Sequence, residues 1–296
     1  MKRRIAFPLL RLLGHQRWLR VGIRNRICRA FLKPDGVVDF PFTKPFFGFR
    51  YRGNLRSTID WTVYFFGVYE RSEIEFITQL PGATTSTILD IGANVGHHTL
   101  AFAAHYHHVH SFEPYPVVRE VLSQRIIDNN IGNVTIHPFG VSNQDDRLRF
   151  YPPGERNLGT GSFVSGHAQN NPHDSDITLE VIVGDSYVQR ENFTNIGAIK
   201  IDIEGFERQA LEGLHDTLEK FRPYVVMEYS SSTRASFVTE ADFRALLPKD
   251  YEIRTMEVDR RFAVLFNRPQ CQLTPFNFKR EQVSLLLYPK ERPVNA

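Results

Sequence analysis

One short segment combines an aspartate and two glycines at a spacing that suits ligand binding. Asp90 ends an apolar run typical of a buried strand, and Gly92, Asn94 and Gly96 follow it. Glycine lets the backbone turn sharply and approach a ligand without a Cβ in the way. The spacing is not that of the GxGxxG sequence that cradles dinucleotide phosphates, and an aspartate here would repel a pyrophosphate. It would instead accept hydrogen bonds from a cationic group, such as a ligand ammonium.

A second acid, Glu113, ends the next apolar run, 23 residues after Asp90. In nucleotide-binding α/β folds an acid about 20 residues after the first turn binds the ribose diol. Together the two segments predict a ligand that carries a ribose and a positively charged amino-acid tail. S-adenosylmethionine fits that description.

A third acidic group follows another apolar run, in the sequence Lys200 to Glu207. Glu204 is our first candidate for the base that removes a proton from an alcohol acceptor, and Asp202 and Glu207 come next. Lys200 would neutralise or orient these acids. Glu207 has a second interpretation, as an acid favourably placed in a first helical turn.

Metal binding is not expected, although six of the eleven histidines lie between His97 and His110. None of them forms the His-Glu-x-x-His pair that places two ligands on one helix face. His97 or His98 could instead contact the ligand from the glycine turn. A site for a divalent cation built only from acids, Asp202, Glu204 and Glu228, is chemically feasible.

These residues need a parallel sheet to position them, and the sequence alternates strand-like with helix-like runs. The strands predicted are Thr87–Ile91, Val109–Phe112, Val134–Pro138, Ala198–Ile203, Tyr224–Met227, Phe262–Phe266 and Val283–Leu287. The helices predicted are Trp61–Leu80, His98–Tyr106, Pro116–Asn129, Phe206–Lys220 and Glu240–Leu247. Residues 34–60 are expected to be extended without a regular element. Residues 34–80 and the polar loop Pro152–Ser175 are expected to cover the crevice.

Charge divides the chain of 296 residues into a basic arm and an acidic body. The net charge is +3, yet residues 1–33 hold ten Lys or Arg and no acid, so the remainder sums to −7. The arm predicts peripheral contact with an anionic membrane; alternatively it is a basic helix packed on the body, or a mobile tail. Its longest apolar run, Ile5 to Leu10, is too short to span a bilayer. Two cysteines favour a reducing compartment, hence a cytoplasmic protein, and no motif indicates nucleic-acid binding.

The chain resembles the FkbM family of S-adenosylmethionine-dependent methyltransferases. The resemblance rests on DIGANVG at 90–96, FEP at 112–114, KIDIEGFE at 200–207 and ME at 227–228, and covers residues 61–290. It implies a class I methyltransferase (Rossmann-like) fold, with a seven-stranded, mostly parallel sheet, an antiparallel last strand and helices on both faces. We therefore expect an arm and extension over residues 1–60 and a methyltransferase domain over 61–296.

The resemblance also implies roles for individual residues. Asp90, Gly92, Asn94 and Gly96 would line the methionine end of the cofactor and Glu113 would hold its ribose. Gly67-Val68-Tyr69-Glu70 looks like a stretch that often precedes the first strand in this family, so Glu70 joins the cofactor set with His98 and Asp202. The expected reaction is O-methylation of a hydroxyl on a sugar, polyketide or other secondary metabolite, so the partner is a small-molecule or glycan acceptor. Two alternatives are a non-catalytic protein that binds S-adenosylmethionine and an NAD-dependent oxidoreductase. The oligomeric state is left open.

Overall fold

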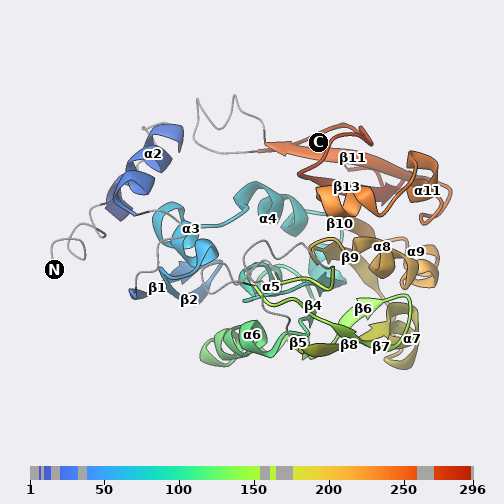
Figure 1. Ribbon diagram of the computed structural model, residues 1–296, viewed down its shortest axis with the longest axis horizontal. Coiled ribbons are helices and arrows are strands. Elements are labelled where there is room, and N and C mark those ends of the chain that lie inside the picture. Colours follow the sequence, from blue (N-terminus) through green and yellow to red (C-terminus); the bar gives the residue numbers. More distant parts are fainter. Residues whose placement is uncertain are drawn as a thin grey trace.

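An eight-stranded sheet forms the centre of the protein (Figure 1). The computed structural model describes residues 7, 10–14, 21–32, 39–153, 161–164, 176–258 and 270–294. Across the sheet the strands are β12 (Cys271–Pro275), β11 (Tyr251–Val258), β13 (Val283–Pro289), β10 (Tyr224–Tyr229), β9 (Ile196–Ile201), β3 (Thr87–Ile91), β4 (His108–Phe112) and β5 (Val134–His137). The five strands from β10 to β5 pair in parallel, and β13 is antiparallel to both of its neighbours.

This architecture confirms the predicted fold class, with one more strand than the seven expected. The extra strand is β12, which pairs antiparallel with β11 at the edge of the sheet. The predicted strand Phe262–Phe266 lies outside the described residues. The strand before it, β11, was not predicted, because its polar residues Glu252, Arg254 and Glu257 interrupt the apolar run.

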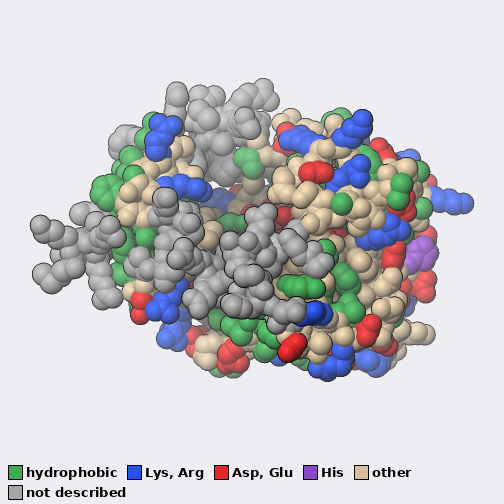
Figure 2. All heavy atoms as spheres, in the orientation of Figure 1, with side chains coloured by type: hydrophobic (Ala, Val, Ile, Leu, Met, Phe, Trp, Pro, Cys, Tyr) green, Lys and Arg blue, Asp and Glu red, His purple; other side chains and the backbone are tan. Residues whose placement is uncertain are grey.

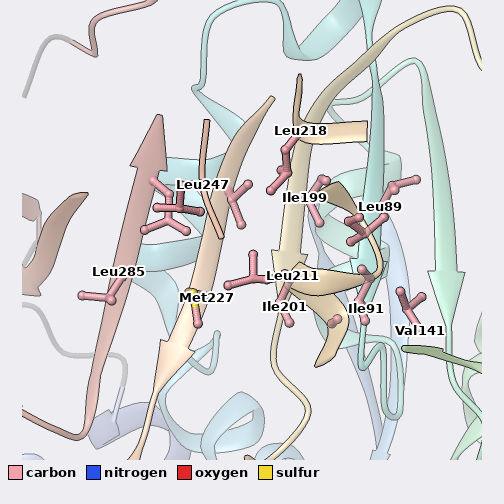
Figure 3. Packing of buried hydrophobic residues seen from close by; sticks show 14 of the residues in the cluster. Leu89, Ile91, Val141, Ile199, Ile201, Leu211, Leu218, Met227, Leu247 and Leu285 are labelled. Atoms are coloured by element: carbon pink, nitrogen blue, oxygen red, sulfur yellow. The ribbon is translucent and has the colours of Figure 1, made fainter. Parts of the chain in front are cut away.

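Helices cover both faces of the sheet, as predicted. One face carries α4 (Arg71–Thr78), α5 (His97–Ala103) and α6 (Pro116–Asp128), and the other carries α7 (Gly184–Arg190), α8 (Glu207–Glu212), α9 (His215–Phe221) and α11 (Glu240–Arg244), while α10 (Ser231–Ala235) follows β10. Alternate strand residues point to opposite faces, so strands buried on both faces are apolar throughout. Figure 3 shows the layer between the strands and α8 and α9, where Ile199, Leu211 and Leu218 interdigitate.

Two predicted helices are each divided in two. The segment Trp61–Leu80 forms α3 (Thr58–Phe66) and α4, because Gly67 and Glu70 have positive φ angles of 97° and 49°. The segment Phe206–Lys220 forms α8 and α9, which are separated at Gly213. A Cβ on Gly213 would overlap the backbone oxygen of Ser142, so the chain passes close to β6 (Gly140–Ser142) at this break.

The segment expected to be extended is a hairpin of β1 (Pro41–Phe46) and β2 (Phe49–Asn54). Proline is tolerated in such an edge pair. Because proline is otherwise rare in strands, the prolines in this segment argued against predicting strands there. Arg125 on α6 anchors the hairpin, because it pairs with Asp60 at 2.9 Å and donates to the backbone oxygens of Val95 and Arg52. The hydroxyl of Tyr51 also donates to Asp60, at 2.6 Å.

The described part of the basic arm packs on α3. Leu10, Cys28 and Leu32 are buried against α3 residues that include Trp61 and Phe65. Within α2 (Val21–Phe31), whose sequence holds three arginines, Ile23 and Phe31 are 46% and 58% exposed. Figure 2 shows hydrophobic and basic side chains together on this part of the surface. The described part of the arm therefore has one face on the body and one apolar and basic face turned outward. No helix in the described ranges is long and apolar enough to cross a membrane.

A small three-stranded sheet and one 3-10 turn complete the described part of the chain. The strand β6 pairs with β8 (Thr178–Val183), which also pairs with β7 (Asp146–Arg149), and η1 (Ala83–Thr85) is a short 3-10 turn before β3. The predicted covering loop 152–175 enters between β7 and β8. Of that loop only residues 152, 153 and 161–164 are described.

Candidate active site

A cleft of about 290 Å³ opens where β3, β9 and β10 end. Parallel strands place their carboxyl ends at one edge of the sheet, and ligands bind where the strand order reverses. Here it reverses between β3 and β9. Acids from separate elements line the cleft around Lys200, namely Glu70, Glu73, Asp202, Glu204 and Glu228. The strand-end acids Asp202, Glu204 and Glu228 thus lie in one cleft.

Gly92 lets the loops after β3 and β9 meet. Its φ is 83°, and a Cβ would overlap the backbone oxygen of Asp202. The backbone N–H of Asp202 donates to the oxygen of Ile91 at 3.0 Å, which locks the two loops together. Gly92 and Asn94 line the cleft. Gly96, with a φ of 81°, precedes α5 beside Leu122, and it is not among the described lining residues.

Asp90 lies beneath the cleft rather than on its wall. It is fully buried, and its Oδ2 accepts a 2.6 Å hydrogen bond from the hydroxyl of Thr99. Its Oδ1 has no hydrogen-bond partner among the described residues but lies 4.0 Å from the ammonium of Lys200. Burial raises the pKa of Asp90, while Lys200 and Thr99 act in the opposite direction. Asp90 therefore influences the cleft through Lys200 and the strand end.

Lys200 holds a permanent positive charge under the acids. Its ammonium lies 3.0 Å from Oδ2 of Asp202, and the residue is 3% exposed. Burial alone would lower its pKa, but the carboxylates of Asp202 and Asp90 outweigh burial and raise it. Lys200 thus cannot act as a base and instead orients Asp202, the role that the sequence suggested.

Four glutamates in the cleft bind protons more tightly than usual, because burial raises the pKa values of Glu70, Glu73, Glu204 and Glu228. Burial, together with the carboxylates of Asp202 and Glu207, raises the pKa of Glu204 to about 8. Burial and the neighbouring acids raise the pKa of Glu228 to about 9. Glu204 has a φ of 53°, a conformation that is uncommon outside glycine and is often found at functional sites.

Glu207 holds the loop that carries Glu204. Its Oε1 accepts hydrogen bonds from the backbone N–H groups of Ile203 and Gly205, and its Oε2 accepts one from Thr233 at 2.7 Å. It is fully buried and is not among the described residues that line the cleft. These contacts give Glu207 a positioning role, at the start of α8 where the sequence placed it.

A smaller recess of about 50 Å³ continues the cleft toward β4. Glu113 lies there, and its two carboxylate oxygens accept hydrogen bonds from the backbone N–H groups of Asn94 (2.9 Å) and Tyr115 (2.8 Å). Burial raises the pKa of Glu113 to about 7, although these N–H groups lower it. The rings of Tyr115, Phe150 and Phe163 form an aromatic wall beside it. Phe163 belongs to the predicted covering loop.

The cleft also contains residues that the sequence analysis did not single out. Glu73 lies on α4 just after Glu70, and it accepts a hydrogen bond from the hydroxyl of Ser284. Ser284 lies near the start of β13, which is antiparallel, so its amino end shares the edge with the carboxyl ends of the parallel strands. The antiparallel direction of β13 could have placed Ser284 at this edge, but an isolated serine in the sequence gave no reason to consider it.

His97 and His98 begin α5 and line the cleft beside Glu70. Both are almost fully buried, and burial lowers both pKa values well below the usual value, so both imidazoles are neutral. His98 Nε2 lies 3.6 Å from Glu70 Oε2. The sequence did not predict this three-residue group, because Glu70 is distant in the chain and the two histidines are adjacent.

Comparison with known proteins now assigns the fold to a family. The Methyltransferase FkbM domain matches residues 90–256, more than half of the chain. The chain belongs to this family. A protein of Beauveria bassiana named Methyltransferase 1 is 25% identical over 242 residues, which cover 73% of this chain and 91% of that protein. The hexuronic acid methyltransferase AglP of Haloferax volcanii is 25% identical over 175 residues, 59% of this chain and 68% of that protein.

Two solved structures are also similar to this FkbM-domain chain. One is Methyltransferase FkbM from Methylobacillus flagellatus KT, with 19% identity and a TM-score of 0.45 over 71% of this chain. The match covers 45% of that protein, so the present chain spans less than half of its length. The other is a Streptococcus mutans protein in complex with SAH, with 10% identity and a TM-score of 0.43 over 74% of this chain and 97% of that one.

The cofactor of this methyltransferase is S-adenosylmethionine, and the cleft fits it. A carboxylate has about four acceptor positions. Backbone N–H groups use two of those on Glu113, so two remain for a ribose diol. The aromatic wall suits an adenine ring, and the acids around Lys200 suit a ligand with sulfonium and ammonium charges. Membership of the FkbM family favours methyl transfer over the NAD-dependent alternative.

Proposed function

We propose that this methyltransferase transfers the methyl group to a hydroxyl oxygen of a sugar-containing acceptor, with Glu204 as the general base. The observation that carries the proposal is the position of Glu204, which lines both the large cleft and the small recess. A cofactor that occupies both would cross the junction at Glu204. The reactive centre would then lie within reach of this carboxylate.

Within the same proposal the cofactor is held by residues at the carboxyl ends of the strands. Glu113 would accept hydrogen bonds from the ribose hydroxyls. The backbone atoms of Gly92 and Asn94 would contact the cofactor. Asp202, held by Lys200, would attract its ammonium group. Asp90 and Gly96 would act by shaping this loop and not by contact.

The raised pKa of Glu204 suits it to remove a proton. A base works best when its pKa lies near the operating pH, and burial raises the pKa of Glu204 to about 8. Bound S-adenosylmethionine supplies an electrophilic methyl group, and an in-line displacement depends mainly on positioning. As the acceptor oxygen bonds to the methyl carbon, its proton passes to Glu204, and Glu207 holds that loop in place.

The charge in the cleft favours a neutral acceptor. Glu70, Glu73, Asp202 and Glu228 surround the single lysine of the described lining. A carboxylate acceptor would add another acid to a site whose burial already raises the pKa of its glutamates, so its ionised form would be disfavoured there. The similarity to AglP, which is named for hexuronic acid, supports a sugar as the acceptor class. We therefore favour a sugar hydroxyl over the carboxylate of an acidic sugar.

Kinetics of Glu204→Gln test this proposal. We expect kcat to fall about 10²–10⁴-fold, while the affinity for S-adenosylhomocysteine, measured by calorimetry, changes little. Glu212→Gln on the neighbouring helix α8 is the matched control, because Glu212 pairs with Arg208 outside the cleft. Equal losses of turnover and cofactor affinity in Glu204→Gln would contradict the proposal and give Glu204 a structural role.

A further inference from the structure

Three potential metal ligands converge on one wall of the cleft. Glu70 precedes α4, and His97 and His98 are the first residues of the neighbouring helix α5. One ligand atom from each lies within 4.8 Å of the other two. The distance from His98 Nε2 to Glu70 Oε2 is 3.6 Å, which is too long for a hydrogen bond.

The imidazole nitrogens of this group lack partners. Both ring nitrogens of His97 and Nε2 of His98 make no hydrogen bond to any described residue, although the two residues are only 4% and 2% exposed. Buried polar atoms are nearly always paired, and an unpaired one destabilises the fold. Three such atoms beside a carboxylate and at the wall of a cleft indicate that a ligand completes them.

We propose that Glu70, His97 and His98 bind a divalent transition-metal ion whose remaining coordination positions face the cleft. Two imidazoles and one carboxylate are a typical set for catalytic Zn²⁺ and for related ions. Ligand atoms at about 2.0–2.2 Å from such an ion lie roughly 3–3.5 Å from one another, so small side-chain rotations close the site. Asp202 and Asp90, at 3.0 and 4.0 Å from the ammonium of Lys200, offset its charge.

This inference deepens the proposed function. An acceptor hydroxyl on an open coordination position would lose its proton more easily, since metal binding lowers the pKa of bound oxygen ligands. The proton would pass to Glu204, the new O–C bond would form, and the S–CH₃ bond would break with its electron pair remaining on sulfur. The sequence assigned Glu70 to cofactor binding, whereas here Glu70 binds the metal and Asp202 faces the cofactor, so the two assignments of Glu70 can be separated by experiment.

Cobalt is the probe, because Co²⁺ in a site of this kind gives visible absorption. Chelator-treated, full-length protein is titrated with Co²⁺ in the presence of saturating S-adenosylhomocysteine. We expect one equivalent to bind, and we expect His97→Phe, His98→Phe and Glu70→Gln each to weaken binding at least about tenfold. His215→Gln on α9, an exposed histidine far along the chain from this group, is the matched control and should bind as the wild type does.

The wild-type protein alone also tests the site, in case the variants fold poorly. The X-ray absorption spectrum of the Co²⁺-loaded protein should show two imidazole ligands. Three results would each overturn the metal proposal. They are an X-ray absorption spectrum without imidazole scattering, a visible Co²⁺ band that is the same in the wild type and the histidine variants, and displacement of Co²⁺ by S-adenosylhomocysteine. Calorimetry of S-adenosylhomocysteine with the metal-free protein tests the proposed function separately, because cofactor binding there would survive a failure of the metal proposal.

Discussion

Replacing Glu113 by glutamine should remove most of the affinity that comes from the ribose hydroxyls. Two acceptor positions of its carboxylate are taken by the N–H groups of Asn94 and Tyr115, so two remain for the diol. A hydrogen bond to a charged group contributes about 1.5–3 kcal/mol. Each of the two hydrogen bonds replaces one to bound water. We therefore expect removal of both hydroxyls to cost about 1.5–3 kcal/mol in total, roughly 10- to 150-fold in affinity.

A double-mutant cycle isolates this contact from the role of Glu113 in holding the loop. Wild-type protein and Glu113→Gln are each titrated by calorimetry with S-adenosylhomocysteine and with its 2′,3′-dideoxy analogue. The wild type should lose the stated affinity when the hydroxyls are removed, and the variant should lose almost none. Glu180→Gln, an exposed position on β8, is the control and should match the wild type. Equal losses in wild type and Glu113→Gln would refute the ribose assignment.

Proton release gives an independent check of the same contact. The pKa of Glu113 is raised to about 7 before ligand binds, mainly by burial. Ribose hydroxyls donate to the ionised carboxylate, so binding should lower this pKa and release protons near neutral pH. Affinity should therefore rise between about pH 6 and about pH 8. Binding heats that do not depend on the ionisation enthalpy of the buffer would show that no proton is released.

Further predictions concern stability and the basic arm. Thr99→Val removes the hydrogen bond to the buried Asp90 and should destabilise the protein by about 1–3 kcal/mol in urea unfolding, with no change contradicting this. Arg125→Met leaves Asp60 buried without its cation, at a cost of about 3–5 kcal/mol by the same measurement. Burial raises the pKa values of Glu204 and Glu228 to about 8 and 9. The native protein therefore keeps protons that the unfolded chain releases, and the melting temperature without cofactor should fall as pH rises from about 5 to about 9; in Glu204→Gln this slope should be smaller. If the basic arm binds anionic membranes, the protein should sediment with anionic but not with neutral vesicles, and Phe31→Asp should weaken this binding. Equal binding to both kinds of vesicle would contradict the membrane prediction.

The sequence predicted best those elements whose bounds depend on residues nearby in the chain. The strand Thr87–Ile91 was predicted to the residue, because a buried parallel strand is apolar throughout and Gly92 ends it. The helix Pro116–Asn129 differs by one residue, since Pro116 marks its start. The hairpin β1–β2 was not predicted, because its prolines argue against strands and its contacts with Arg125 lie about 70 residues away in sequence.

The site shows the same division. Strand-end acids such as Asp202 and Glu204 could be placed in one region, because parallel strands share an edge. The position of Asp90 under the cleft could not be predicted, because it depends on contacts with Thr99 and Lys200. The group of Glu70 and His98 depends on how α4 packs against α5, which no local pattern in the sequence records.

The measurement that tests the account most directly is the identity of the atom that receives the methyl group. Protein is incubated with ¹³C-methyl-labelled S-adenosylmethionine and a panel of neutral and acidic glycans, and the products are analysed by ¹H–¹³C correlation NMR. We predict an acceptor-dependent methyl signal on a sugar hydroxyl oxygen, strongly reduced in Glu204→Gln. Label on nitrogen, carbon or a uronate carboxylate, or full transfer by Glu204→Gln, would contradict the account.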